Sequence, residues 1–152
     1  MTVLLSLLAP LLIAVLAGAT HAQTLKISDR HGSKTVTAQQ LLADPAIRTV
    51  TISNDSVYGR SMTYRAIPPA TLLKGLAVGA DDYVEFTATD KFSIGVPARL
   101  LLSPDQRPHA WLAIEAGTTW PAIPGHGKDT PGPFFLVWQD ARRGEISSEY
   151  WV

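Results

Sequence analysis

The stretch MTYRAIPPATLL, from Met62 to Leu73, constrains the fold of this chain more than any other. Its first residues alternate in character, which is typical of a strand with one buried face. Pro68 disfavours helical backbone at the residue before it, so the strand should extend as far as the two prolines. Pro69 then suits the first turn of a helix, because its missing N–H leaves no donor unpaired there. The stretch therefore predicts a strand that passes directly into a short helix.

Strand patterns and short helix patterns fill the chain on both sides of this stretch. Thr37 and Gln40 match a capping box, which predicts a helix that ends before Asp44. A third helix is expected to start at Pro97. Strands are predicted over residues 24–28, 34–36, 47–52, 62–67, 83–88, 92–96, 110–115 and 134–138. The pattern indicates one α+β domain, with a mixed β-sheet core and two or three short helices.

The first 22 residues contain no charged side chain and are rich in leucine and alanine. They end in small residues at Ala22, which is typical of a secretory signal that is cleaved there. A retained membrane anchor is the alternative, but the run is short and is interrupted by Pro10 and Gly18. We therefore expect a signal peptide over residues 1–22, one domain over residues 23–152, and a periplasmic or secreted protein with no stable membrane span.

The composition excludes several kinds of function. Lysine and arginine number 13, as do aspartate and glutamate, and the missing basic excess argues against a nucleic-acid partner. Cysteine is absent, which excludes disulfides, thiolate metal ligands and a cysteine nucleophile. His31, His109 and His126 do not have the spacing of metal ligands, so no metal site is predicted. No nucleophile-elbow motif supports a hydrolase, and no catalytic residue can be named.

Four local motifs follow one another along the chain: Arg65-Ala66-Ile67-Pro68 with Leu72-Leu73, Asp90-Lys91-Phe92-Ser93-Ile94, Val96-Pro97 with Leu100-Leu101, and Gly132-Pro133-Phe134-Phe135-Leu136-Val137. In this order and spacing, the motifs resemble the sulfite-oxidase-type molybdopterin-binding domain over about residues 24–138. The resemblance implies the fold of that family and a small exported member of it, truncated at its C-terminus. It also implies molybdopterin as the possible cofactor.

In catalytic members of that family, a cysteine thiolate binds molybdenum just after the strand that corresponds to residues 49–52. This chain has Ser53 and Asn54 at that place, followed by Asp55. A serine hydroxyl is much harder to deprotonate than a thiol, whose pKa is about 8.5. The resemblance therefore implies a retained fold without the molybdenum chemistry, and we expect no cofactor. An enzyme that binds molybdopterin through Ser53 is the alternative.

Two groups of residues are candidates for binding a ligand. Glycines on both sides of His126 leave the backbone free to approach a ligand, and Lys128 adds a positive charge, although a solvated turn explains both. Arg60 and Arg65 offer planar guanidinium groups, which suit a small anion or a haem propionate. In catalytic relatives, arginines near the metal hold the oxyanion substrate. The alternative for Arg65 is a structural ion pair.

We first expect an exported, non-catalytic binding or accessory module. By family analogy, its partner would be a periplasmic redox protein such as a c-type cytochrome. The alternatives are a molybdopterin-dependent oxidoreductase with a non-cysteine metal ligand, and a small-anion or organic-ligand binding protein. Residues 150–152 are expected either to pack on the body of the domain or to leave an exposed apolar patch that favours self-association. The candidate ligand-binding residues are Ser53, Asn54, Arg60, Arg65, His126 and Lys128.

Overall fold

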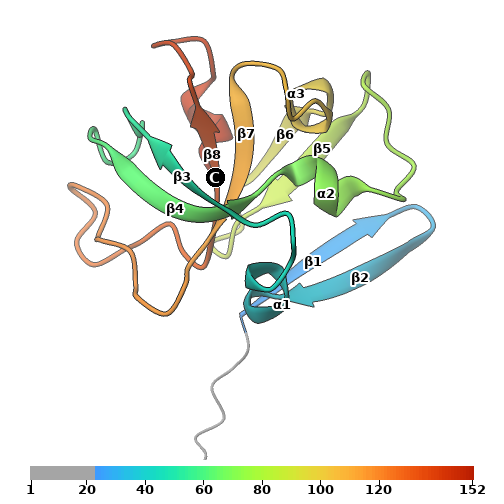
Figure 1. The fold of residues 1–152 in the computed structure, drawn as a ribbon, viewed down its shortest axis with the longest axis horizontal. Helices are drawn as coiled ribbons and strands as arrows, with labels where there is room; N and C mark the ends of the chain where they lie inside the picture. Colours follow the sequence, from blue (N-terminus) through green and yellow to red (C-terminus); the bar gives the residue numbers. More distant parts are fainter. Residues whose placement is uncertain (1–22) are drawn as a thin grey trace, which may run out of the picture.

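The computed structural model describes residues 23–152, and the predicted signal peptide lies outside the described residues. Figure 1 shows short helices packed around small antiparallel sheets, and the α+β expectation is confirmed. The elements are β1 (Thr24–Asp29), β2 (Gly32–Thr37), α1 (Ala38–Leu42), β3 (Arg48–Ile52), β4 (Met62–Ile67), α2 (Pro69–Leu73), β5 (Tyr83–Thr87), β6 (Ser93–Pro97), α3 (Arg99–Leu102), β7 (His109–Ile114), β8 (Phe134–Gln139) and the 3-10 helix η1 (Ser148–Tyr150).

The strands form a central sheet and two separate hairpins. The central sheet has the strand order β3-β4-β7-β8, and the hairpins are β1–β2 and β5–β6. Every strand ladder within residues 23–152 is antiparallel. The mixed sheet expected from the sequence is therefore not seen, because each paired strand in this part of the chain runs back against its neighbour.

The central sheet curls until its two outer strands, β3 and β8, lie in contact. The Gln139 side-chain amide donates to the Thr51 carbonyl across this contact, at 3.4 Å. Curling gives the sheet a concave inner face, which holds a buried cluster that we call the inner core. Its members are Val50, Ile52, Tyr64, Ala66, Ala113, Phe135 and Val137.

The outer face of the sheet is covered by two separate layers. The β1–β2 hairpin and α1 pack on one part, around Leu41, Ile67 and Leu112. The β5–β6 hairpin, α2 and α3 cover the other part, around Leu101 and Leu136. The two hairpins therefore lie on the same side of the sheet without pairing with each other.

The local signals read from the sequence explain where the first two helices begin. Thr37 Oγ1 accepts from the Gln40 amide at 3.1 Å, and Gln40 Oε1 accepts from the Thr37 amide at 2.8 Å, so the capping box is confirmed. Pro69 stands in the first turn of α2, as expected. Pro97 differs, since it ends β6, and α3 begins only after Ala98.

The last residues pack on the body of the domain, which is the first of the two alternatives expected for them. The Trp138 indole N–H donates to the Tyr150 carbonyl at 2.9 Å, and the rings of Trp151 and Phe135 lie 6.4 Å apart. The Leu136 amide donates to the Val152 carbonyl at 2.6 Å, which ties the end of the chain to β8. Within residues 23–152, no helix has the length and apolar character needed to cross a bilayer.

Candidate functional site

Asp55, in the loop between β3 and β4, is a fully buried carboxylate. Its Oδ1 accepts from the amides of Val57 and Tyr58, each at 3.0 Å, and its Oδ2 accepts from the Tyr64 hydroxyl at 2.8 Å. The Asp55 amide in turn donates to the Arg60 carbonyl at 3.0 Å. A buried charge is tolerated only when it is well hydrogen-bonded. Asp55 therefore fixes the shape of this loop, and neither of its oxygens is free for a ligand.

Two buried tyrosines connect this loop to the rest of the site. Burial, and then the hydrogen bond to Asp55, raises the pKa of Tyr64 above its ordinary value of 10.0. Burial and the Asp55 charge also raise the pKa of Tyr58, against the guanidinium of Arg60, which lies 5.9 Å from the Tyr58 ring. The Tyr58 hydroxyl donates to the Pro121 carbonyl at 2.6 Å. Both phenols thus stay protonated at neutral pH and act as structural donors.

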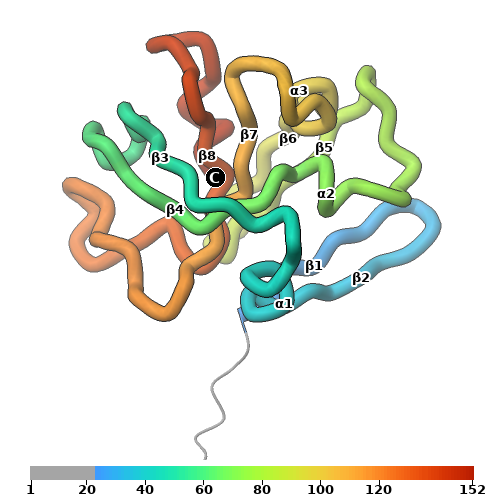
Figure 2. The backbone as a smooth tube through the Cα atoms, in the orientation of Figure 1, coloured from blue at the N-terminus to red at the C-terminus, as the bar shows by residue number. Residues whose placement is uncertain are grey.

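The long segment between β7 and β8 is anchored on the inner core. The Trp120 ring meets Tyr64 edge-on, with centroids 5.2 Å apart, and its amide donates to Glu115 Oε1 at 2.8 Å. Glu115 also packs against Gly132, where a Cβ atom would lie 2.8 Å from the same oxygen. In Figure 2 this segment (orange) extends on the same side as the β3–β4 loop (green). The segment is therefore held at both ends.

The glycines around His126 serve the turn itself. Gly125 and Gly127 have φ angles of +81° and +66°, which side chains rarely adopt. They allow the chain to reverse so that the Ile123 amide donates to the Asp129 carbonyl at 2.7 Å. The backbone freedom that suggested close approach to a ligand is thus used to close a turn, which favours the solvated-turn interpretation.

The structure does not gather the predicted binding residues into one site. They lie on the β3–β4 loop, on β4 and on the long segment, and all six side chains are exposed. His126 borders the groove described next, whereas Lys128 does not. The residues in question are Ser53, Asn54 and Arg60 on the loop, Arg65 on β4, and His126 and Lys128 on the segment.

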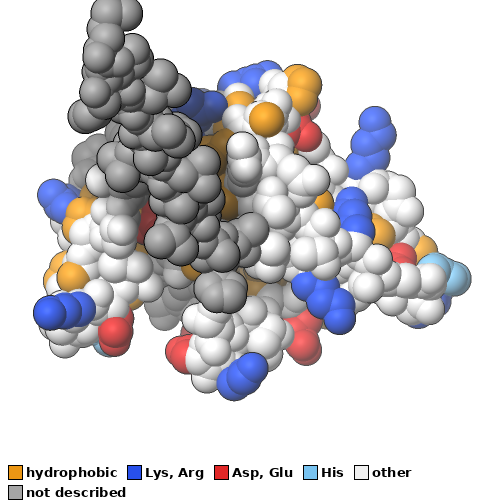
Figure 3. Space-filling view, turned by 90° about the horizontal axis from the view of Figure 1, so that it is seen from below, with side chains coloured by type: hydrophobic (Ala, Val, Ile, Leu, Met, Phe, Trp, Pro, Cys, Tyr) orange, Lys and Arg blue, Asp and Glu red, His pale blue; other side chains and the backbone are white. Residues whose placement is uncertain are grey.

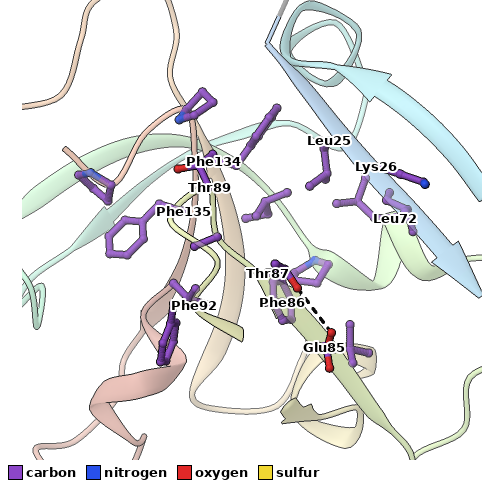
Figure 4. Close-up of a pocket in the computed structure, with 18 of the residues that line it drawn as sticks. Leu25, Lys26, Leu72, Glu85, Phe86, Thr87, Thr89, Phe92, Phe134 and Phe135 are labelled. Atoms are coloured by element: carbon purple, nitrogen blue, oxygen red, sulfur yellow. Dashed lines mark hydrogen bonds between the residues drawn. The ribbon is translucent and has the colours of Figure 1, made fainter. Parts of the chain in front are cut away.

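A groove of about 1560 Å³ separates the two hairpins, and we call it the hairpin groove. Every residue of β1 and of β5 lines it, whereas no residue of β2 or β6 does. Since β1 pairs only with β2 and β5 only with β6 in the described chain, the free edges of β1 and β5 both border the groove. Figure 4 shows Leu25 and Lys26 of β1 across the groove from Phe86 and Thr87 of β5.

The groove is apolar inside and charged at its rim. Leu25 and Ile27 of β1 and Val84 and Phe86 of β5 are half-buried. Leucines of α2 also line the groove, with Phe134 and Phe135. Lys26 and Arg30 lie at the β1 rim, and Asp82, Glu85 and Asp90 lie at the β5 rim.

Two exposed aromatic side chains stand out at this groove. Tyr83 is 67% exposed and Phe92 is 44% exposed, and they are the exposed large hydrophobic residues within 23–152. Both line the hairpin groove. The sequence analysis missed them as binding residues, because in a strand pattern each reads as an ordinary strand former. Tyr83 alternates with the half-buried Val84 and Phe86, so the strand pattern places its side chain on the solvent-facing side of β5. The sequence therefore contains a signal that Tyr83 is exposed.

The charged side chains visible in Figure 3 are scattered over that face of the molecule and form no single basic patch. No group of three or more histidine, aspartate or glutamate side chains within residues 23–152 is arranged to hold a metal ion. The residues after β3 also do not fit the molybdenum site that the resemblance implies. Cysteine is absent, Ser53 is exposed, and the Asp55 oxygens are already engaged.

Comparison with known proteins does not place the chain in a family. No protein-family model matches it, and neither a curated protein nor a solved structure does. What defines the class of this protein is therefore its own geometry: an α+β domain with a rigid polar loop and an open groove between two hairpins.

Proposed function

We propose that this protein is an exported, non-catalytic binding module with a sulfite-oxidase-type fold, which binds an extended segment of a partner protein in the hairpin groove. The observation that carries the proposal is the position of Tyr83 and Phe92. These two exposed large hydrophobic side chains both border the same groove. Exposed apolar surface next to a concave, apolar lining is typical of an interaction site.

The free edges of β1 and β5 favour an extended segment as the ligand. An edge strand presents unpaired N–H and C=O groups, which an added strand can satisfy. Here two such edges border one groove. A segment that lies between them can pair with β1, with β5 or with both. Strand addition would thus satisfy backbone groups that otherwise depend on water.

The lining of the groove defines the chemistry of that segment. Leu25 and Phe86 are half-buried and line the groove, so they suit apolar side chains at alternate positions of a bound strand. Lys26 on one rim and Glu85 on the other suit charged residues of both signs on its exposed face. We expect an alternating apolar and charged segment. By family analogy, the protein that carries it would be a periplasmic redox protein such as a c-type cytochrome.

The geometry supports a binding module better than an oxidoreductase. An oxygen ligand at Ser53 would need nearby cations to stabilise its alkoxide. Arg60, the first basic residue after Ser53 in the sequence, has its guanidinium 5.9 Å from the Tyr58 ring. Asp55, two residues beyond Ser53, is an anion whose presence opposes a second negative charge. No observation on this chain favours the enzyme alternative.

Selection of displayed peptides on the immobilised protein tests the proposal. We expect enriched peptides with apolar residues at alternate positions. A Tyr83→Ser/Phe92→Ser variant should bind them at least about tenfold more weakly, since aromatic residues at interfaces carry much of the binding energy. Both side chains are exposed, so the variant should fold. Lys74→Ser/Arg99→Ser, exposed residues outside the groove, is the matched control and should bind like the wild type.

Two results would contradict the proposal. One is a selection in which no peptide is enriched more on the wild-type protein than on the Tyr83→Ser/Phe92→Ser variant. The other is equal affinity of the enriched peptides for that variant and for the control.

Export is tested separately. Protein recovered from a Gram-negative periplasm should have the intact mass of a chain that starts at Gln23. A membrane-bound species that retains Met1 would instead support the anchor alternative.

A further inference from the structure

The central sheet opens into a fork where β4 and β7 separate. β4 pairs with β7 only over Arg65–Ile67, so the first half of β4 has no partner on that side. The chain leaves β7 after Ile114 and diverges from β4. The space between them is a pocket of about 390 Å³, which we call the fork pocket. Its lining is Met62, Thr63, Arg65, Ile114, Ala116, Thr118, Thr119, Trp120 and Pro121.

The wall of the fork pocket that Trp120 and Pro121 form is held in place by contacts within the domain itself. The Trp120 amide donates to Glu115 at 2.8 Å, and the Trp120 ring packs edge-on against Tyr64. The Pro121 carbonyl accepts from the Tyr58 hydroxyl at 2.6 Å. A pocket whose walls are already ordered loses less conformational entropy on binding.

The charge of the pocket is positive. Arg65 is the one charged side chain in its lining, and within residues 23–152 it forms no salt bridge. The ion-pair alternative for Arg65 therefore finds no partner in the described chain. Glu115 follows Ile114, the strand partner of Arg65, but its carboxylate accepts the Trp120 amide and packs against Gly132. A planar guanidinium that forms no salt bridge within the described chain suits a carboxylate ligand.

The remaining lining divides into polar and apolar parts. Thr118 and Thr119 bring hydroxyl groups, which can complete the hydrogen bonds of an anion. Met62 and Trp120, which are both half-buried, bring apolar surface, and the ring of Trp120 is flat. The volume lies within the usual range of small-ligand pockets, about 300–1,000 Å³. The lining is thus mostly apolar with a few polar groups, as is usual for sites that bind small organic molecules.

We propose that the fork pocket binds a small organic carboxylate with a flat apolar body. The carboxylate pairs with Arg65, and the apolar body lies against Met62 and Trp120. This site goes beyond the proposed protein-binding function, because the fork pocket and the hairpin groove share no lining residue. Either site can therefore fail its test without affecting the other.

Isothermal titration calorimetry with benzoate, and with neutral benzamide as its matched isostere, tests the proposal. We expect saturable binding of benzoate and much weaker binding of benzamide. Arg65→Gln should weaken benzoate binding about tenfold or more, because it removes the charge-assisted hydrogen bonds that a guanidinium makes to a carboxylate. Arg143→Gln, which removes an exposed arginine outside the pocket, is the matched control and should leave benzoate binding unchanged.

A second measurement on the wild-type chain does not depend on any variant's folding. The indole N–H resonance of Trp120, assigned with Trp120→Phe, should shift on addition of benzoate while that of Trp138 stays unchanged. Trp138 lies in the buried cluster on the other face of the sheet. The proposal is contradicted if benzoate does not bind saturably, if benzamide binds equally well, or if Arg65→Gln and Arg143→Gln bind benzoate alike.

Discussion

The Tyr64 hydroxyl donates a hydrogen bond of 2.8 Å to the buried carboxylate of Asp55. This contact joins β4 of the central sheet to the loop that follows β3. The same carboxylate accepts two backbone amides of that loop. The pair therefore sets the position of the β3–β4 loop, and Trp120 packs on the Tyr64 ring from the other side.

Asp55→Ala should destabilise the fold strongly, because it leaves two amides and a buried phenol without their acceptor. We expect a loss of about 3 kcal/mol in the free energy of unfolding, measured by urea denaturation. Asp81→Ala, at an exposed position, is the control and should change the free energy by less than about 0.5 kcal/mol. Equal effects of the two substitutions would contradict this account of the loop.

Alkaline pH should destabilise the fold through Tyr64. Its pKa is raised in the folded state, so its contribution to stability is complete below the ordinary pKa of 10.0. Above that pH the unfolded tyrosine ionises while the folded one stays neutral, which favours unfolding. The melting temperature should fall as pH rises above 10.0, and it should fall less steeply in Tyr64→Phe. Parallel pH profiles for the two proteins would rule out this role for Tyr64.

Gly132→Ala should destabilise the long segment, because the added Cβ would lie 2.8 Å from Glu115 Oε1. Glu115 cannot move away freely, since it accepts the Trp120 amide. We expect a loss of about 2 kcal/mol in unfolding free energy. In a double-mutant cycle with Glu115→Ala, the Gly132→Ala substitution should then cost much less. Additive costs would show that the two residues do not interact.

The parts of the fold that depend on neighbouring residues were predictable from the sequence. The capping box of Thr37 and Gln40 and the strand-to-helix passage at Pro68 and Pro69 both lie where the sequence predicts them. Each depends on backbone geometry within four or five residues, which the residue types determine directly.

The candidate sites depend on contacts between distant residues, and the sequence analysis missed most of them. Asp55 resembles an ordinary polar loop residue in the sequence, and its burial depends on the pairing of β3 with β4, which brings the Tyr64 hydroxyl to its carboxylate. The hairpin groove likewise arises because two hairpins pack on one sheet without pairing. Arg65 was recognised as a candidate, but its pocket depends on where β4 and β7 diverge.

Metal analysis separates the binding module from the enzyme alternative. Molybdenum in the proposed fold family is held by a protein sulfur, and this chain has no cysteine. Protein purified from the periplasm should therefore contain no stoichiometric molybdenum and should show no sulfite- or sulfoxide-dependent electron transfer. About one molybdenum per chain, lost in Ser53→Ala, would restore the oxidoreductase alternative.

Amide hydrogen exchange with a selected peptide bound tests the central claim most directly. If the peptide adds as a strand in the hairpin groove, amides of β1 or β5 that face the groove should exchange more slowly, because they gain hydrogen bonds. Amides of β3, which lies in the central sheet outside the groove lining, should exchange as before. Slower exchange at the edge of β1 or β5 is the predicted result. Unchanged exchange at both edges, with a peptide that binds, would contradict the account.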